Sequence, residues 1–422
     1  MNILQRSRTN PAVNNFFEHN PFYMPDKDLV LDHKNAHRWF SMLGSSAREG
    51  VYTFENILEG KSGPCVRVEK SRFYMMSSYD YLGLIGHPKI EKAAIKAIRD
   101  FGTGSGGVRL LTGTNALHER LERLIHEFKG TESAMVFNSG YMANIAAITA
   151  LFNRSDRIII DEFVHRSIID GLKILGAAPE RFRHNDMQSL EDLLSAPHSK
   201  SRTIIIVEGI YSMDGDICPL DEVVRLKEKY GAVLMIDEAH SIGVLGALGS
   251  GVNEYFDIRP ERVDIFTGSL SKAIPSNGGF VAARKEIILY LKHSSAPYIF
   301  SAALTPANTA TAIEAIELLY TENWRLQALW KNSQRMLQGL KQAGIDTGNS
   351  KSPVIPVMMN HSGKALVLSR RLFDRGYIAN AVIYPAVPTD RARLRLCCTA
   401  AQTPGMIDGF ISTLKEAAFN LH

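Results

Sequence analysis

Short apolar runs alternate with amphipathic segments from about residue 87 onward, and this alternation constrains the fold more than any other feature. Apolar residues recur every three and four positions in HPKIEKAAIKAIRDF (87–101) and NALHERLERLIHEF (115–128), which predicts two amphipathic helices. Seven short apolar runs follow: SAMVF, RIIID, ERFRH, TIIIVE, AVLMID, VDIFT and GGFVAA. Because helical segments separate most of them, we expect an α/β fold with a seven-stranded, mostly parallel sheet covered on both faces. The last two runs leave little room for a helix between them, so that pair is predicted to be antiparallel.

The pattern along the chain predicts three parts. Residues 1–65 contain scattered aromatic residues without a clear period, and we expect an N-terminal arm there. Residues 66–303 contain the predicted sheet and are expected to form a large domain. After about residue 304 a long helical stretch is followed by the runs PVIPVMMN and RLRLCC and a closing helix. This change of pattern predicts a smaller C-terminal α+β domain over residues 304–422.

The composition is that of an ordinary globular protein. Of the 422 residues, 45% are hydrophobic and 22% are charged, and the net charge of +4 does not require a nucleic-acid partner. Cys65, Cys218, Cys397 and Cys398 have neither metal-ligand spacing nor a disulfide framework. The first ten residues have no apolar signal core, and no run approaches the length of a membrane span. We therefore expect a cytoplasmic protein with no metal site, no nucleic-acid partner and no membrane span.

Two motifs match nucleotide-binding signatures but lie in the wrong context. The sequence DEAH (237–240) names a group of helicases. An ATPase also needs the phosphate-binding loop G-x-x-x-x-G-K-[ST], and the one candidate, which ends at residues 60–62, has Glu55 in place of the first glycine. The stretch GTGSGGVR (102–109) contains G-x-G-x-x-G but follows a helical pattern instead of a strand. We therefore reject the ATPase and NAD interpretations. Glycines this dense still indicate a tight backbone or close approach to a ligand.

The predicted strand ends carry the residues most suited to chemistry. Ligands of parallel α/β sheets lie beyond the carboxyl ends of the strands, and Glu208, Asp237 and Ser269 lie at such ends. Lys272 follows closely, in a loop of serine, proline and glycine residues. A partly desolvated lysine in such a loop suits Schiff-base chemistry. Pyridoxal 5′-phosphate (PLP) needs a lysine imine and a carboxylate beside its pyridinium nitrogen, and Lys272 and Asp237 supply this pair.

Over residues 70–415 the sequence resembles the α-oxoamine synthases, fold-type-I PLP enzymes that join an amino acid to an acyl thioester with loss of CO₂. The motifs that carry the resemblance, in chain order, are SYDYLGLIGHP, GTGSGGVRLLTGTNALHERLE, FNSGYMAN, HRSIIDG, HND, VEGIYSMDGD, IDEAHSIGVLG, SLSKA and YPAVPTDRARLRL. The resemblance implies a PLP-dependent C-acyltransferase whose substrates are an amino acid and an acyl-CoA or acyl-carrier-protein thioester. In this interpretation Asp237 binds a pyridinium ring, and DEAH is a coincidence of letters.

The resemblance also implies roles for residues around the PLP ring. Lys272 would hold PLP as a Schiff base and act as the acid–base at the substrate α-carbon. Asp237 would keep the ring nitrogen protonated. His165 would stack on the ring face, and His240 would hydrogen-bond the 3-oxygen. Glu208 would line the pocket.

Further roles concern the phosphate and the substrate. The backbone amides of Gly140 and Tyr141, at a predicted helix N-terminus, would bind the phosphate. The hydroxyls of Ser269 and Ser271 would also bind the phosphate, and Ser301 would reach the phosphate of the neighbouring subunit in a homodimer. Ser212 would line the pocket, Arg395 would bind the carboxylate of the amino acid, and Tyr79 would contact the substrate. For Arg393 we expect an ion pair or solvent.

The substrate remains open at this stage. Tyr79 stands where many family members have Asn and is similar to the serine palmitoyltransferase branch, whereas Ile383 occupies a position where that branch has Arg. Glycine, alanine and serine are all compatible, and we favour a serine-palmitoyltransferase-like enzyme over an 8-amino-7-oxononanoate-synthase-like or glycine-C-acyltransferase-like one. Another fold-type-I enzyme, such as an aminotransferase or lyase, would share Lys272 and Asp237. A non-catalytic partner subunit would typically lack the lysine.

Overall fold

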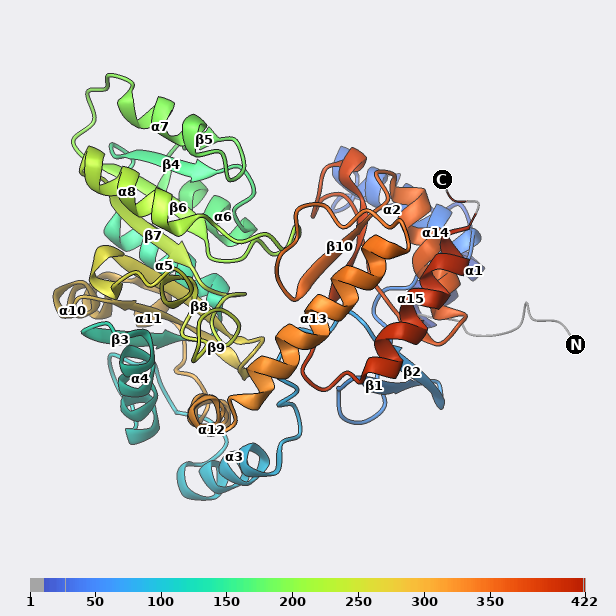
Figure 1. The fold of residues 1–422 in the computed structure, drawn as a ribbon, viewed down its shortest axis with the longest axis horizontal. Helices are drawn as coiled ribbons and strands as arrows, with labels where there is room; N and C mark the ends of the chain where they lie inside the picture. The colour runs from blue at the N-terminus through green and yellow to red at the C-terminus, as the bar shows by residue number, and fades with distance from the viewer. Residues whose placement is uncertain (1–10, 27, 420, 422) are drawn as a thin grey trace, which may run out of the picture. The chain divides into compact units, whose positions relative to one another are not determined.

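The computed structural model describes residues 11–26, 28–419 and 421 (Figure 1). The first ten residues of the predicted arm lie outside the described residues. Contacts divide the chain into two compact units. Unit 1 contains the described residues up to Ser78, together with Lys331–Gly348 and the chain from Pro353 onward, and unit 2 contains Tyr79–Trp330 and Asn349–Ser352.

Unit 2 contains the predicted seven-stranded sheet, in the order β3-β9-β8-β7-β6-β4-β5. Its strands are β3 (Ser133–Phe137), β4 (Arg157–Asp161), β5 (Glu180–Phe182), β6 (Thr203–Glu208), β7 (Val233–Asp237), β8 (Ile265–Ser271) and β9 (Pro275–Ala283). Five neighbouring strands of this sheet are parallel, in the order β5, β4, β6, β7 and β8. Strand β9 runs antiparallel to β8 and to β3. The predicted α/β fold, all seven runs and the antiparallel last pair are confirmed.

The helices of unit 2 cover this sheet. They are α3 (Pro88–Phe101), α4 (Ala116–Lys129), α5 (Gly140–Leu151), α6 (Arg166–Leu175), α7 (Met187–Ser195), α8 (Leu220–Tyr230), α9 (Val252–Tyr255), η2 (Pro260–Arg262), α10 (Lys285–Ser294), α11 (Ala296–Ile299) and α12 (Pro306–Thr321). The two helices predicted from apolar spacing are α3 and α4. α5 packs on α6 and, through Ala143, Ala146 and Ile148, joins a core cluster with the isoleucines of β4 and β6. Parallel strands buried on both faces need such continuous apolar runs.

Unit 1 contains two three-stranded sheets, β1-β2-β11 and β10-β13-β12. Its elements are α1 (Pro11–His19), α2 (Lys34–Arg48), β1 (Cys65–Val68), β2 (Ser71–Met75), β10 (Val354–Met358), α14 (Ser362–Phe373), β11 (Tyr377–Ile378), β12 (Ala381–Val382), η3 (Thr389–Arg391), β13 (Arg393–Cys397) and α15 (Pro404–Ala418). α13 (Trp324–Gln342) begins in unit 2 and continues in unit 1. The runs predicted after residue 350 form β10 and β13.

The contact-defined units have different boundaries from the predicted domains. β1 and β2 belong to unit 1 because β2 pairs with β11 and Phe73 packs on Phe373, with ring centroids 4.5 Å apart. α12 belongs to unit 2 because it packs against α3 and α4. Among the residues that the structure describes, no helix has the length and apolarity needed to cross a membrane.

Candidate active site

The carboxyl ends of β6, β7 and β8 bring three polar residues into one row. In the register of the sheet, Glu208 lies beside Asp237, and Asp237 lies beside Thr267. All three side chains are buried. Burial of two neighbouring carboxyl groups is unfavourable unless each is hydrogen-bonded or neutralised, so this row identifies the edge of the sheet where chemistry is concentrated.

Asp237 is held in a fixed orientation by hydrogen bonds to both of its carboxylate oxygens. Asn144 Nδ2 in α5 donates to Oδ2 at 2.6 Å, and the backbone N–H of Ala239 donates to Oδ1 at 2.9 Å. Thr267 Oγ1 donates to Asn144 Oδ1 at 2.6 Å and so fixes the amide of Asn144. Asn144 and Thr267 were not among the predicted site residues. Two sequence features could have indicated them. Asn144 is a polar residue in the mostly apolar helix that begins in the FNSGYMAN motif, and Thr267 is the hydroxyl residue that begins TGSLSKA.

His165 is connected to Asp237 through the same amide. Asn144 Nδ2 also donates to Ser167 Oγ at 2.8 Å, and Ser167 Oγ lies 2.8 Å from His165 Nδ1. His165 is the N-cap of α6, and its ring is exposed. An anchored histidine with an exposed ring is suited to stacking on a flat ligand.

His240 lies three residues after Asp237 and is buried between aromatic side chains. Its Nδ1 is 2.8 Å from the Tyr81 hydroxyl. The Tyr79 ring meets the His240 ring edge-on, with centroids 6.0 Å apart. Tyr81 was not predicted as a site residue, although it lies in the SYDYLG motif. Tyr79 was predicted, and the structure places it against His240.

Glu238, the second residue of DEAH, forms a fully buried ion pair with Lys129 at the end of α4. Lys129 Nζ lies 2.9 Å from Glu238 Oε1 and 2.8 Å from Asn253 Oδ1, and it also donates to the Ser250 carbonyl. Glu238 accepts in addition from the Val252 backbone N–H. The pair therefore fixes the turn after β7, on which Asp237 and His240 lie.

Lys272 begins the turn between β8 and β9 and is half-buried. Ser269 and Ser271 precede it, with their hydroxyl oxygens 2.7 Å apart across a register shift in the strand pair. The N-terminus of α5 packs closely against this strand: a Cβ at Gly140 would lie 2.9 Å from Ser269 Cβ, and one at Gly279 would lie 2.5 Å from Gly140 N. Hydroxyls and helix N-terminal amides thus converge at one place, which suits an anion such as a phosphate.

Tyr141 occupies the first turn of α5, where the prediction uses its backbone amide. Its exposed side chain donates a hydrogen bond from the hydroxyl to Asp170 Oδ2 at 2.7 Å. Ser139 caps the helix by accepting from the Met142 backbone N–H. The side chain of Tyr141 is therefore directed to α6, and what it offers a ligand is its backbone.

The environment of Glu208 favours its neutral form. Burial raises its pKa well above the ordinary value, the Asp237 charge raises it further, and the Lys272 charge only partly opposes this. Among the residues that the structure describes, its Oε1 has no hydrogen-bond partner although it is buried. A buried acid with an unsatisfied oxygen is an attachment point for a ligand. Ser212, also buried, lies in the loop that follows β6.

These features fit PLP. They comprise a lysine, a carboxylate oriented from both oxygens, an exposed histidine ring and an anion cradle at a helix N-terminus. A cofactor with a phosphate, a flat ring and a basic ring nitrogen needs each of these. All of them lie in unit 2 and around the carboxyl edge of its sheet.

Two further predicted residues, Ser301 and Arg395, are not members of this row. Ser301 is half-buried and follows Phe300, whose side chain is 81% exposed. Arg395 lies in β13 of unit 1, where its backbone carbonyl accepts from Ser77 Oγ at 3.1 Å. For Arg393 the solvent alternative is wrong, because the side chain is 1% exposed and its Nε donates to the Arg391 carbonyl at 3.0 Å.

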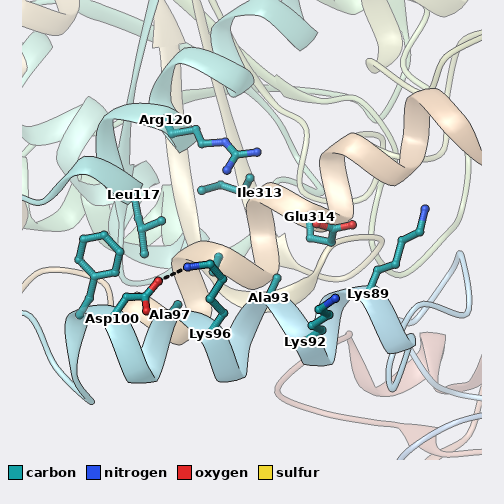
Figure 2. Close-up of a pocket in the computed structure, with 12 residues that line it drawn as sticks. Lys89, Lys92, Ala93, Lys96, Ala97, Asp100, Leu117, Arg120, Ile313 and Glu314 are labelled. Carbon is teal, nitrogen blue, oxygen red and sulfur yellow. Dashed lines mark hydrogen bonds and ion pairs between the residues drawn. The ribbon is translucent and has the colours of Figure 1, made fainter.

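A hollow of about 410 Å³ lies among α3, α4 and α12, and the described residues that line it include none of the predicted site residues. Figure 2 shows Lys96 paired with Asp100 on α3, and Arg120 of α4 on the wall of the same hollow. Arg120 in turn pairs with Glu317 at 2.5 Å. Since none of the predicted site residues lines this hollow, we assign it no part in the chemistry.

Comparison with known proteins extends these observations. The family described as aminotransferase class I and II matches residues 73–414. The chain is 42% identical to 8-amino-7-oxononanoate synthase of Thermoanaerobacter pseudethanolicus, over 89% of this chain and 95% of that protein. It is 39% identical to serine palmitoyltransferase of Bacteroides thetaiotaomicron, over 87% of this chain and 93% of that protein.

Solved structures give the same two kinds of relative. Serine palmitoyltransferase from S. paucimobilis, solved with a bound PLP–myriocin aldimine, has a TM-score of 0.89 and 31% identity and covers 94% of this chain and 99% of that chain. An 8-amino-7-oxononanoate synthase from Francisella tularensis has a TM-score of 0.72 and 26% identity and covers 82% of this chain and 97% of that chain.

Proposed function

The chain belongs to the aminotransferase class I and II family and, within it, to the PLP-dependent α-oxoamine synthases, and from this premise we propose that it condenses serine with a long-chain acyl thioester. The reaction class is decarboxylative C-acylation: an amino acid and an acyl thioester give an α-amino ketone, CO₂ and a free thiol. The choice of serine and of a long acyl chain is our proposal. The roles below are likewise proposals for residues of this chain.

We assign Asp237 to the ring nitrogen of PLP and Lys272 to its aldehyde carbon. The support for Asp237 is the pair of hydrogen bonds to its carboxylate from Asn144 and Ala239, which hold it in one orientation. Bound there, PLP supplies an electron-withdrawing ring that stabilises negative charge at the α-carbon of the amino acid. With PLP bound, Lys272 would take the α-proton of the amino acid and later return a proton to the product.

The other residues of the candidate site are proposed to bind and orient the cofactor. The amides of Gly140 and Tyr141 and the hydroxyls of Ser269 and Ser271 are proposed to hold the phosphate. His165 covers one ring face, and His240, whose other side contacts Tyr81, holds the 3-oxygen. Glu208 and Ser212 line the pocket. Because burial and the Asp237 charge raise the pKa of Glu208, its carboxyl group favours the neutral form, which avoids a second negative charge beside Asp237.

The choice of serine as the amino acid rests on the tyrosine at position 79. Its ring lies edge-on against His240 in the candidate site, and tyrosine at this position is similar to the serine palmitoyltransferase branch. The higher TM-score with a serine palmitoyltransferase points the same way. Ile383, where that branch has Arg, is the feature that favours the alternative of alanine or glycine. We propose that Arg395 binds the carboxylate of the amino acid, and this proposal rests on the family resemblance alone.

We also propose a homodimer in which Ser301 reaches the phosphate of the neighbouring subunit. Leu111, Leu289, Tyr290 and Phe300 of unit 2 are each more than half exposed. A bridge between Val108 and Ala302 holds the loop with Leu111 beside the segment with Phe300 and Ser301. Exposed large apolar residues next to a proposed subunit-crossing residue fit a second copy of this chain. Light scattering of the purified protein measures the subunit number.

Release of free thiol tests the proposed reaction. Palmitoyl-CoA is supplied with serine, alanine or glycine in separate assays, and the ω-carboxyacyl-CoA that an 8-amino-7-oxononanoate product requires is supplied with alanine. We expect thiol release to be fastest with serine and palmitoyl-CoA, with the amino ketone identified by mass. Faster release with alanine and the ω-carboxyacyl-CoA would move the assignment to the alternative branch. Absence of thiol with every pair, together with transfer of the amino group to a keto acid, would indicate an aminotransferase instead.

A further inference from the structure

The HND motif is a family motif that the proposed site does not use, and its histidine lies between two carboxylates. His184 Nδ1 donates to Asp161 Oδ1 at 2.9 Å, and Nε2 donates to Asp216 Oδ2 at 2.6 Å. The side chains of Asp161, Asp216 and His184 are 0%, 10% and 13% exposed. With both ring nitrogens donating, the imidazole is a cation shared by two buried acids.

Aromatic packing fixes the plane of this ring. The His184 ring stacks on Phe163 with centroids 4.3 Å apart, and the Tyr211 ring meets it at 90° with centroids 4.4 Å apart. Asn185, which has a left-handed φ of 53°, donates from its backbone N–H to Asp161 Oδ2 at 2.9 Å and from Nδ2 to Asp216 Oδ2 at 3.1 Å. His184 and Asn185 therefore bind the same two carboxylates from adjacent positions, and the ring has little freedom to rotate.

The two carboxylates belong to segments that carry different residues of the candidate site. Asp161 ends β4, and its Oδ1 accepts from the Phe163 backbone N–H at 2.8 Å, in the segment that leads directly to His165. Asp216 lies in the loop after β6, which is closed by the bridge between Ile210 and Ile217. The Tyr211 backbone N–H donates to the Asp216 carbonyl at 3.1 Å, and Ser212 is the next residue. His184 is thus the charged link, beside the uncharged Asn185, between the segment of His165 and the loop of Ser212.

Charge explains why this link needs a cation. Asp161 and Asp216 both hydrogen-bond one imidazole, so a neutral side chain there would leave two buried carboxylates facing each other. Removal of one partner from a buried charge network leaves an uncompensated charge, which the surrounding loops relieve by moving apart. Burial lowers the pKa of His184, but the hydrogen bonds and charges of Asp161 and Asp216 outweigh this and raise it to about 10.

We propose that His184 is a positioning residue that clamps segment 161–165 to loop 209–218 and so sets the spacing between His165 and Ser212. The inference rests on the proposed function in that it takes His165 and Ser212 as contacts of the cofactor. His184 itself contacts neither substrate nor ring. Its effect on PLP is transmitted through Asp161 and Asp216.

The test compares His184→Gln with Arg157→Gln, a matched control on the same strands. Arg157 begins β4 and binds Glu180 at the start of β5 through Nε at 2.8 Å and Nη2 at 2.7 Å, at the opposite edge of the sheet. Both substitutions break a charged link between neighbouring strands. Three quantities are measured: the melting temperature of the apoprotein, the dissociation constant for PLP titrated into the apoprotein, and kcat and KM for thiol release.

We expect both variants to melt at lower temperature, but only His184→Gln to bind PLP differently. Its PLP dissociation constant should rise about tenfold or more and kcat should fall about 10- to 100-fold, the loss that displacement by about 1 Å imposes, with KM for the amino acid less affected. Arg157→Gln should keep both quantities within about twofold of the unmodified protein. Equal effects of the two variants on PLP affinity, or an unchanged PLP affinity in His184→Gln, would overturn the proposal.

Asp216→Asn provides a second measurement if His184→Gln does not fold. This variant keeps the Asp161–His184 pair and removes the charge on the side of the Ser212 loop. We expect a smaller rise in the PLP dissociation constant in the same direction, and an unchanged constant would contradict the clamp. PLP titration needs no turnover, so it remains informative if the unmodified protein releases no thiol and the proposed reaction is wrong.

Discussion

At the amino edge of the seven-stranded sheet the ion pairs of Arg202 and Arg157 each have one partner exposed to solvent, whereas at the carboxyl edge the charged side chains are buried and shared. Arg202, whose side chain is 44% exposed, binds the buried Asp156 at 2.6 Å, and the buried Arg157 binds Glu180, whose side chain is 42% exposed. At the carboxyl ends, Asp161, Glu208 and Asp237 are buried on neighbouring strands and interact with His184, Lys272 or the amide of Asn144. Both edges contain Asp and Glu side chains with polar or cationic partners.

Burial of both interacting partners, and not the number of charges, therefore distinguishes the reactive edge from the stabilising one. An exposed pair is screened by water and changes little when one partner is lost. A buried carboxylate whose partners are shared responds strongly to the loss of any of them. Variants at the two edges should therefore differ in kind: those at the carboxyl edge change chemistry, and those at the amino edge change stability slightly.

Lys272→Ala should have the largest effect. It removes both the attachment point of PLP and the base at the α-carbon, so thiol release should fall by about 10⁴-fold or more, while the protein remains folded. Thiol release and the melting temperature measure the two outcomes. Activity near that of the unmodified protein would disprove the proposed role of Lys272.

Asp237→Asn should lower kcat by about 10²- to 10⁴-fold, because a neutral amide does not hold a proton on the ring nitrogen. The Schiff base with Lys272 should still form, since that bond does not involve Asp237. The visible absorption of the bound cofactor reports the Schiff base, and single-turnover thiol release reports the rate. A rate within a few-fold of the unmodified protein would remove Asp237 from the pyridinium.

The pH dependence of stability should carry the signature of His184. Its pKa is about 10 in the folded protein and near 6.5 in the unfolded chain, so its stabilisation is complete below about pH 6.5. The folded protein keeps a proton that the unfolded chain loses, and stability therefore falls as pH rises through the window to about 10, at up to about 1.4 kcal/mol per pH unit. Denaturant unfolding of the apoprotein across this window measures the slope.

The same titration in His184→Gln provides the control. Burial also raises the pKa of the Tyr211 phenol and the Cys218 thiol well above their ordinary values, and the charge of Asp161 raises both further. These two groups contribute to the slope of both proteins, and they cancel in the difference. If the difference between the two curves does not change from pH 6.5 to 10, His184 is not the cation between the two acids.

Glu208→Gln should have a much smaller effect than Asp237→Asn, although the two residues are neighbours in the sheet register. Burial first, and then the Asp237 charge, raises the pKa of Glu208, which favours the neutral carboxyl group, and an amide of similar shape replaces that form. We expect kcat within about tenfold of the unmodified protein. Loss of activity as large as that of Asp237→Asn would mean that Glu208 acts as a carboxylate.

Much of this fold could be predicted from the sequence because buried parallel strands are continuous apolar runs, and all seven runs form strands. The row of Glu208 and Asp237 was predictable for the same reason, since strand ends are visible in the pattern. The boundaries of the units were not, because the pairing of β2 with β11 joins residues about three hundred positions apart.

The supporting network of the site was also hidden from the sequence. Asn144 is a polar residue in a helix whose other residues are mostly apolar, and nothing in the helix itself shows that it faces Asp237. His184 was visible within a motif, but its partners Asp161 and Asp216 are 23 and 32 positions away along the chain. These contacts exist only once the order β6-β4-β5 is formed, so local patterns carry no trace of them.

Arg202→Met should have the smallest effect and so defines the other end of the comparison. Asp156, whose side chain is 2% exposed, loses one partner but keeps the hydrogen bond that its Oδ2 accepts from the Asn153 backbone N–H at 2.8 Å, and the Arg202 side chain that is replaced is 44% exposed. We expect the free energy of unfolding to fall by about 1 to 2 kcal/mol, with PLP affinity and kcat unchanged. Denaturant unfolding and PLP titration on the same preparation measure both. A loss of PLP affinity here would show that the amino edge is coupled to the chemistry, and the separation of the two edges by burial would then fail.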